Sequence, residues 1–153
     1  MAAAEPPTAT PKLAFLIDTN VLLDVVLERK PWVEDATALL DAVAKGRAAG
    51  YVASHAIPTV YYVVARERDR AAAATATSDL LQLLTVVPLD NAGFQRALGL
   101  GLRDFEDGAQ AAACLQVGAD CLVTRNPKDY REAPVTLRTA GEAVALLDSA
   151  QAR

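Results

Sequence analysis

The sequence has few residues for metal sites or acid–base pairs built on imidazole or thiolate side chains. His55 is the only histidine among 153 residues, which excludes a multi-histidine zinc site and a two-histidine acid–base pair. The chain also lacks a P-loop motif and the nucleophile elbow of serine hydrolases. No apolar run approaches the roughly 18 residues that a membrane span needs, and no signal sequence is evident. We therefore expect a cytoplasmic protein, outside the membrane, whose chemistry rests on carboxylates.

Basic residues are too few for a broad nucleic-acid-binding face. Lys and Arg number 15 against 19 Asp and Glu, which gives a formal net charge of -4. Binding through a broad basic face neutralises many phosphates and needs a matching number of cations. A local contact with an anionic substrate, bridged by a metal ion, remains open. The two cysteines, Cys114 and Cys121, are expected to be reduced and buried.

Short apolar segments alternate with longer segments of helical character. The predicted strands are residues 13–17, 51–54, 86–89, 121–124 and 135–137. The predicted helices are residues 21–28, 32–45, 58–67, 71–84, 91–98 and 105–117, with a last helix to 148 that begins at a capping box. This alternation predicts an α/β fold: a three-layer α/β/α sandwich with a mostly parallel sheet. We expect one domain over residues 12–148, between a flexible N-terminus (1–11) and a C-terminal tail (149–153).

Oxygen-bearing side chains follow the predicted strands at one edge of the sheet. Asp18 ends the first strand, Asp104 and Asp107 open the helix at 105–117, and Asn126 and Asp129 follow the fourth strand. Ligands of such sheets bind at the carboxyl ends of the strands. Helix capping or turn formation accounts for several of these residues one at a time. Their coincidence at one edge instead favours a site for Mg²⁺ or Mn²⁺.

Three motifs occur in a fixed order along the chain. They are LIDTNVLLD at 16–24, DFED at 104–107 and LVTRNPKDY at 122–130. In this order and spacing they resemble the PIN-domain ribonucleases, and within them the VapC-type toxins of toxin–antitoxin systems, over about residues 13–147. The resemblance implies a PIN-like parallel-sheet fold and a metal-dependent endoribonuclease, the toxin of a type II toxin–antitoxin pair.

The resemblance also implies which residues form the site. Asp18 and Asp107 would be the principal metal ligands, and Asn126 and Asp129 match positions where the family usually has Asp or Asn. Asp104 would ligate the metal or orient water. The implied partners are an RNA substrate and a cognate antitoxin, and a homodimer stays open. A metal hydroxide is the expected nucleophile because the chain has no second histidine.

One departure from the family leaves an alternative function open. The family usually places a Glu near the start of the helix after the second strand, where this sequence has Thr59. Without that acid, the chain could be a catalytically silent PIN-like module that binds RNA or protein. A receiver-like phosphoacceptor domain would also use strand-end carboxylates and Mg²⁺. It is disfavoured because no acid ends the third strand in a suitable pair with Asp18, although Asp90 is near.

Other residues have two interpretations each. Arg125 and Lys128 flank the loop after the fourth strand, where they could contact phosphate or remain ordinary solvated charges. The apolar stretch at 61–64 is either core packing or a surface for an oligomer or antitoxin. His55 is interpreted as a loop or capping residue beside the second strand.

Overall fold

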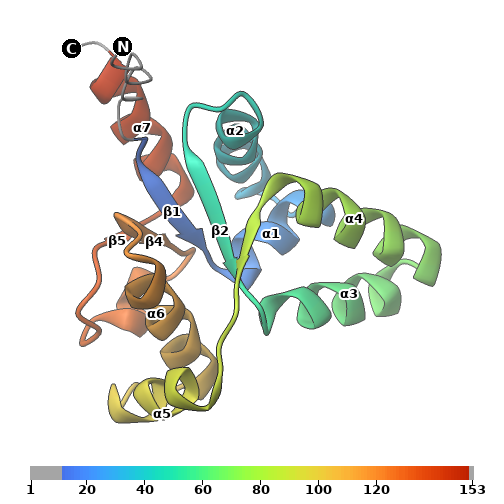
Figure 1. Cartoon of the computed structure of the whole chain (residues 1–153). Helices are drawn as coiled ribbons and strands as arrows, with labels where there is room; N and C mark the ends of the chain where they lie inside the picture. The colour runs from blue at the N-terminus through green and yellow to red at the C-terminus, as the bar shows by residue number, and fades with distance from the viewer. Residues whose placement is uncertain (1–11, 152–153) are drawn as a thin grey trace, which may run out of the picture.

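A five-stranded parallel sheet forms the centre of the computed structural model, which describes residues 12–151 (Figure 1). The strand order is β3-β2-β1-β4-β5, and every neighbouring pair is parallel. The strands are β1 (Ala14–Ile17), β2 (Ala49–Ala53), β3 (Thr85–Val87), β4 (Cys121–Val123) and β5 (Leu137–Arg138). The predicted parallel sandwich is therefore confirmed. The N-terminus predicted to be flexible, residues 1–11, lies outside the described residues.

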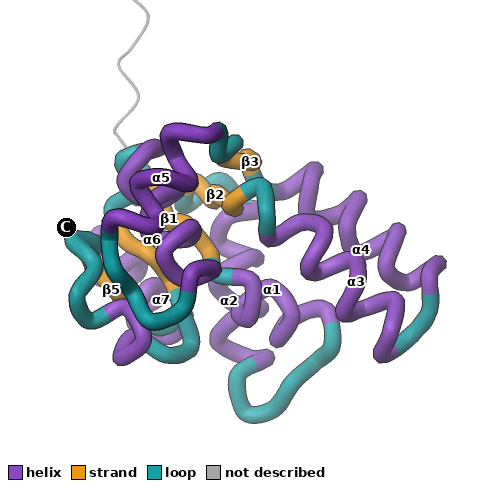
Figure 2. The backbone as a smooth tube through the Cα atoms, turned by 90° about the horizontal axis from the view of Figure 1, so that it is seen from below, coloured by secondary structure: helices purple, strands orange, loops and turns teal. Residues whose placement is uncertain are grey.

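Seven α-helices in the described residues cover the two faces of the sheet (Figures 1 and 2). They are α1 (Thr19–Val26), α2 (Val33–Ala44), α3 (Ala56–Glu67), α4 (Arg70–Leu83), α5 (Asn91–Gly99), α6 (Phe105–Val117) and α7 (Ala140–Gln151). Helices α1 to α4 and α7 share one core with the sheet, whereas α6 packs on the other face and carries α5. No helix in this part of the chain is long and apolar enough to cross a membrane.

The central strand explains why its sequence is continuously apolar. Phe15 and Ile17 belong to the core under α1, and Leu16 belongs to the core under α6. All three side chains are fully buried, as expected for a strand with helices on both faces. This burial fixes where β1 ends, and the next residue, Asp18, lies at the carboxyl edge of the sheet. Figure 2 views the molecule from that edge.

The predicted elements form with small shifts at their ends. Helix α6 matches its predicted span, but β5 begins two residues later than the start predicted at 135, and α7 continues to Gln151, into the predicted tail. A short 3-10 helix, η1 (Pro127–Tyr130), occupies the predicted loop after β4 because Pro127 favours a helical first turn. Both cysteines are buried and unbonded, as predicted.

The apolar stretch at 61–64 divides between core and surface. Val64 is fully buried, whereas Tyr61 and Tyr62 are 36% and 65% exposed. Only the valine side of α3 therefore belongs to the core, and the two tyrosines lie on the surface.

The crossing of α5 and α6 generates a stability prediction. A Cβ atom on Gly108 would lie 2.8 Å from the backbone oxygen of Ala97, whereas a Cβ on Gly99 would meet nothing within 4 Å. Gly108→Ala should lower the free energy of unfolding by roughly 1–3 kcal/mol because backbone must move. Gly99→Ala should raise it by roughly 0.4–1 kcal/mol. Urea denaturation measures both, and equal effects would show that the crossing is not tightly packed.

Candidate active site

Asp18 is buried at the end of the central strand and is bound by side chains from the β4 segment. It is 6% exposed, and its backbone N–H continues the sheet by donating to the Val123 carbonyl at 2.9 Å. It occupies the N-cap position of α1, but its side chain makes no capping hydrogen bond. Its Oδ2 instead accepts hydrogen bonds from Thr124 Oγ1 at 2.9 Å and from the Tyr130 hydroxyl at 3.1 Å. Helix capping therefore does not account for Asp18.

The Tyr130 hydroxyl lies between Asp18 and Asp107. It is 3.1 Å from Asp18 Oδ2 and 3.1 Å from Asp107 Oδ1. Tyr130 is 1% exposed and packs in the α6-side core at the end of η1. A phenol has one proton, so it donates to one carboxylate at a time. The two carboxylates are thus held near one hydroxyl that cannot satisfy both.

Burial raises the pKa of both carboxyl groups. The pKa of Asp107 rises to about 6, because the ionised form loses water on burial. The hydrogen bond from Tyr130 opposes this rise, while the charges of Asp104, Asp18 and Asp129 add to it. Burial likewise raises the pKa of Asp18, against the hydrogen bonds that it accepts. Two acids that resist ionisation next to each other favour the presence of a cation.

The remaining predicted site residues lie at the rim. Asp104 Oδ1 accepts a hydrogen bond from the Asp107 backbone N–H at 3.2 Å, so Asp104 does cap α6. Asp104, Asp107 and Asp129 line an open cavity of about 550 Å³ with Arg103 and Lys128. This cavity is accessible from solvent and brings the two rim acids beside Asp107.

Asn126 is the predicted site residue with the least direct contact to the acids. It is exposed, and its backbone N–H donates to Thr124 Oγ1 at 3.3 Å. Its side chain makes no hydrogen bond to any group within residues 12–151. Within the same range, no three Asp, Glu, His or Cys side chains form a group that could hold a metal ion. The structure thus joins Asp18 to Asp107 through Tyr130 and places Asp104, Asp107 and Asp129 around one cavity, whereas the Asn126 side chain is hydrogen-bonded to none of these acids, and no closed coordination shell forms.

A pair of carboxylates is nevertheless a donor set that fits Mg²⁺. This ion keeps several waters and is usually bound by one or two carboxylates together with phosphate oxygens of a substrate. Asp18 and Asp107 supply such a pair, and neither forms an ion pair with a basic side chain in the described part of the chain. The uncompensated charge and the shared hydroxyl are consistent with a cation bound between them.

Thr59 and His55 lie at the start of α3, beside the end of β2. The Thr59 hydroxyl donates to the His55 carbonyl oxygen at 3.1 Å, so it is engaged within its own helix. His55 lies in the turn after β2, as one of its two interpretations predicted, and its ring makes no capping hydrogen bond although it is at the N-cap position. Both ring nitrogens are buried and have no partner among the described residues, and burial lowers the pKa of the ring. Neither residue replaces the Glu that the family usually has here.

Gln110 connects the two helices that carry the acids. Its Nε2 donates to Thr19 Oγ1 at 3.0 Å, which joins α6 to the first turn of α1. Gln110 is 2% exposed, and its Oε1 has no partner within residues 12–151. This bond fixes the position of Asp107 relative to Asp18, since each acid is within one turn of it.

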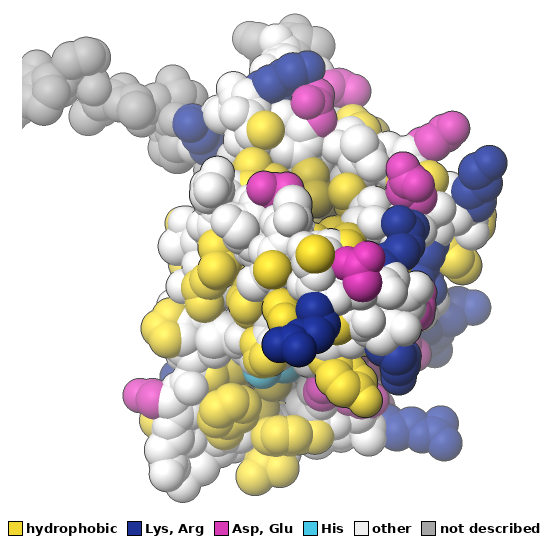
Figure 3. Space-filling view, turned by 90° about the vertical axis from the view of Figure 1, so that its right-hand side faces the viewer, with side chains coloured by type: hydrophobic (Ala, Val, Ile, Leu, Met, Phe, Trp, Pro, Cys, Tyr) yellow, Lys and Arg dark blue, Asp and Glu magenta, His cyan; other side chains and the backbone are white. Residues whose placement is uncertain are grey.

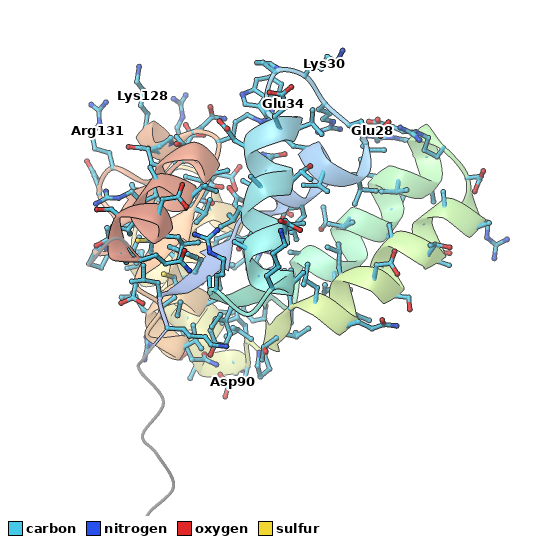
Figure 4. All side chains as sticks on the ribbon, turned by 90° about the horizontal axis from the view of Figure 1, so that it is seen from above. Glu28, Lys30, Glu34, Asp90, Lys128 and Arg131 are labelled. Atoms are coloured by element: carbon cyan, nitrogen blue, oxygen red, sulfur yellow. The ribbon has the colours of Figure 1, made fainter. Side chains whose placement is uncertain are left out.

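Arg125 is paired and stacked, and is not an ordinary solvated charge. Its Nε donates to Asp24 Oδ2 at 3.2 Å, and its Nη2 donates to Asp24 Oδ1. The Trp32 ring covers the guanidinium at 3.8 Å from the ring centroid. By contrast, Lys128 points outward from the molecule (Figure 4).

Sequence reasoning missed the partners on which this geometry depends. Tyr130 and Asp24 both lie inside motifs that point to the site, yet neither was given a role. For Asp24 a signal existed, because a charged residue within the apolar run of α1 needs a buried partner. For Tyr130 no local signal places its hydroxyl, which depends on the path of η1.

The raised pKa of Asp107 predicts how stability changes with pH in metal-free protein. Folded Asp107, with a pKa of about 6, holds its proton more tightly than the unfolded chain, where the ordinary value is 3.8. Its contribution to stability therefore falls as pH rises from about 4 to about 7. Asp107→Asn stays neutral, so it should be more stable than the wild type above pH 6, with the difference shrinking toward pH 4.

Urea denaturation in the presence of a chelator at several pH values measures that difference. Asp90→Asn is the matched control, because Asp90 caps α5 through the Gly93 N–H and asparagine caps equally well. If the free energies of unfolding of wild type and Asp107→Asn changed in parallel with pH, the raised pKa of Asp107 would be contradicted.

Comparison with known proteins gives the family and the fold. A family model described as PIN domain matches residues 14–128, whereas no curated protein sequence matches the chain. Among solved structures, VapBC2 from Rickettsia felis, bound to a DNA fragment from its promoter, is 15% identical, with a TM-score of 0.67, and the alignment covers 83% of this chain and 98% of that one. A toxin–antitoxin complex from Klebsiella pneumoniae is 19% identical, with a TM-score of 0.62, and the alignment covers 82% of this chain and 96% of that one. VapC20 of Mycobacterium tuberculosis, a sarcin-ricin loop cleaving toxin, is 14% identical, with a TM-score of 0.59, and the alignment covers 71% of this chain and 86% of that one. The match to the family model covers most of the chain, which therefore belongs to the PIN domain family.

Proposed function

We propose that the protein is a metal-dependent endoribonuclease, the toxin of a type II toxin–antitoxin pair. The observation that carries this proposal is the pair Asp18 and Asp107, which face one hydroxyl. Asp18 is buried, Asp107 is half-buried, and neither has a basic counter-charge among the described residues. Membership of the PIN domain family supports it. The structural similarity to VapC20, whose described activity is cleavage of the sarcin-ricin loop, agrees with an RNA substrate.

Each residue of the site then has a chemical role. A bound Mg²⁺ or Mn²⁺ would neutralise the scissile phosphate and lower the pKa of a coordinated water. Asp18 and Asp107 would hold the ion. Thr124 and Tyr130 fix the Asp18 carboxylate through the hydrogen bonds on Oδ2, which prevents it from rotating. Asp129, at the open rim, would orient water.

Asp104 and Asn126 have supporting roles in this proposal. Asp104 caps α6 and so holds the first turn that carries Asp107. Its charge next to Asp107 raises the affinity of the pair for a cation. Asn126 is exposed beside Thr124 and would orient water or substrate from the loop after β4.

The alternative function is a catalytically silent PIN-like module that binds RNA or protein. Thr59 favours it, since its hydroxyl is engaged within α3 and supplies no charge to the site. The two functions differ in one observable, which is RNA cleavage that depends on a divalent metal and on Asp18.

We also propose a cognate antitoxin as partner. The similar structures include toxin–antitoxin complexes. A groove of about 700 Å³ between α1 and the α3–α4 hairpin offers an apolar surface for an amphipathic segment of that antitoxin, with Val25, Val26, Leu80 and Leu83 in its wall. The wall of the groove shares no residue with the cavity at Asp104, Asp107 and Asp129, so an antitoxin segment bound there would leave that cavity for a second contact.

Metal binding is the first prediction of this function. Calorimetry should show Mn²⁺ or Mg²⁺ binding to wild type and its loss in the double variant Asp18→Asn Asp107→Asn, because amides cannot neutralise a divalent charge. Asp90→Asn, a carboxylate that caps α5, should bind metal as wild type does. Equal binding by the double variant and wild type would contradict a metal site at this pair.

Toxicity is the second prediction. Expression of wild type without an antitoxin should arrest growth and produce cleaved RNA, whereas Asp107→Asn should do neither at the same level of folded protein. The amide preserves the size of the side chain and the backbone contact with Asp104, so folding is retained. Equal growth of both strains, with soluble protein in each, would support the silent module.

A further inference from the structure

The only tryptophan of the chain lies on the surface and contacts Arg125, in the loop after β4. Trp32 is 41% exposed, although tryptophan is the largest apolar side chain. Its ring covers the guanidinium of Arg125 at 3.8 Å from the ring centroid. A half-exposed ring with a cation behind it is a flat surface to which another planar group can be added.

Arg125 holds this flat surface in a fixed position relative to the site. Its guanidinium is bound to both oxygens of Asp24, whose side chain is 2% exposed. Thr124, the preceding residue, is hydrogen-bonded to Asp18. Asp24 lies on α1, six residues after Asp18 at its N-cap, which is about 9 Å along the helix axis at the usual rise per residue. The Trp32 ring is thus linked to Asp18 through the end of β4 and through α1.

A cavity of about 360 Å³ adjoins the ring. Its wall includes Trp32, Arg125 and Asp35, together with Gly141 at the start of α7. Asp35 is exposed, and its side chain makes no hydrogen bond or ion pair with any residue between 12 and 151. A carboxylate in the wall repels phosphate but accepts N–H donors. The cavity is therefore suited to a nucleobase rather than to the backbone of a nucleic acid.

Cations lie outside this cavity, on the same side of the molecule. Lys30 lies two residues before Trp32, and Lys128 lies three residues after Arg125. Figure 4 shows Lys30, Lys128 and Arg131 pointing outward on the side where Glu28 and Glu34 also lie, with Asp90 on the opposite side. Basic side chains also gather along one edge of the face shown in Figure 3, although the net charge is -4. Phosphates could follow these cations while a base enters the cavity.

We propose that Trp32, backed by Arg125, stacks a base of single-stranded RNA in the cavity beside Asp35, close to the cleaved phosphate. The inference rests on the proposed ribonuclease function only in taking RNA as the ligand. Base stacking on aromatic side chains is the usual way in which proteins hold unpaired nucleotides. Trp32 is then a specificity-determining residue, separate from the carboxylates.

The single tryptophan provides a direct measurement. Asp107→Asn serves as the background, so that RNA is bound without cleavage. A single-stranded RNA of ten nucleotides should quench the Trp32 fluorescence, and an abasic strand of the same length should not, because only a base can stack. Equal quenching by both strands, or none by either, would overturn the proposal.

Affinity supplies the second measurement. In the same background, Trp32→Ala should raise the Kd for labelled RNA roughly 5- to 150-fold, which is the range for loss of one stacked base. Trp32→Phe should lose less, since a smaller ring still stacks. Tyr62→Ala is the matched control, because Tyr62 is 65% exposed and stacks on Arg66 on another part of the surface. It should leave the Kd unchanged.

The outcomes separate this inference from the ribonuclease proposal. If Asp107→Asn binds RNA equally with and without Trp32→Ala, while wild type cleaves RNA, the stacking site is wrong and the ribonuclease stands. If RNA quenches Trp32 but no metal supports cleavage, the stacking site stands and the ribonuclease is wrong. Equal losses of affinity in Trp32→Ala and Tyr62→Ala would also overturn the stacking site.

Discussion

The site depends on one hydroxyl group that faces two carboxylates, one buried and one half-buried. Tyr130 reaches Asp18 across 112 residues of sequence and also contacts Asp107. These contacts bring together the end of β1, the first turn of α6 and the short helix after β4. One phenolic proton cannot satisfy two ionised acids, so the arrangement is under-compensated at neutral pH. A cation that binds both carboxylates would relieve this imbalance, which is why the geometry favours a metal site.

The same arrangement opposes stability and suits the cation site that we propose. Burial raises the pKa of both acids, which shows that their charged forms are disfavoured in the folded metal-free protein. An apolar pair at these positions would avoid that cost. Hydrogen bonds from Thr124 to Asp18 and from Gln110 to Thr19 instead hold the acids in place. The fold therefore keeps two carboxyl groups whose ionised forms are disfavoured, as is common at sites that bind a ligand or carry out chemistry.

Local sequence patterns predict the framework of this protein better than its contacts. Short apolar runs identify the parallel strands. Asp18 directly follows the first run, and Asp107 lies in the first turn of the helix predicted at 105–117. The strand predicted at 135–137 forms at Leu137–Arg138 instead, and its position was hard to predict because only two of its residues pair with β4. The hydroxyl of Tyr130 and the Asp24–Arg125 pair were missed, because each depends on contacts between residues more than 100 apart. Thr59 was correctly placed at the start of α3, but its bond to the His55 carbonyl depends on its rotamer, which spacing does not specify.

Two successive residues after β4 serve two different parts of the surface. Side chains of neighbouring residues in an extended segment point in opposite directions. Thr124 contacts Asp18 at the acidic site, whereas Arg125 contacts Asp24 and supports the Trp32 ring. Both acids belong to the β1–α1 segment, so the position of the ring and that of the carboxylates are set by the same strand pair. A change that moved β4 relative to β1 would displace both together. The fold thus couples the place where a phosphate would be cleaved to the place where a neighbouring base would be held.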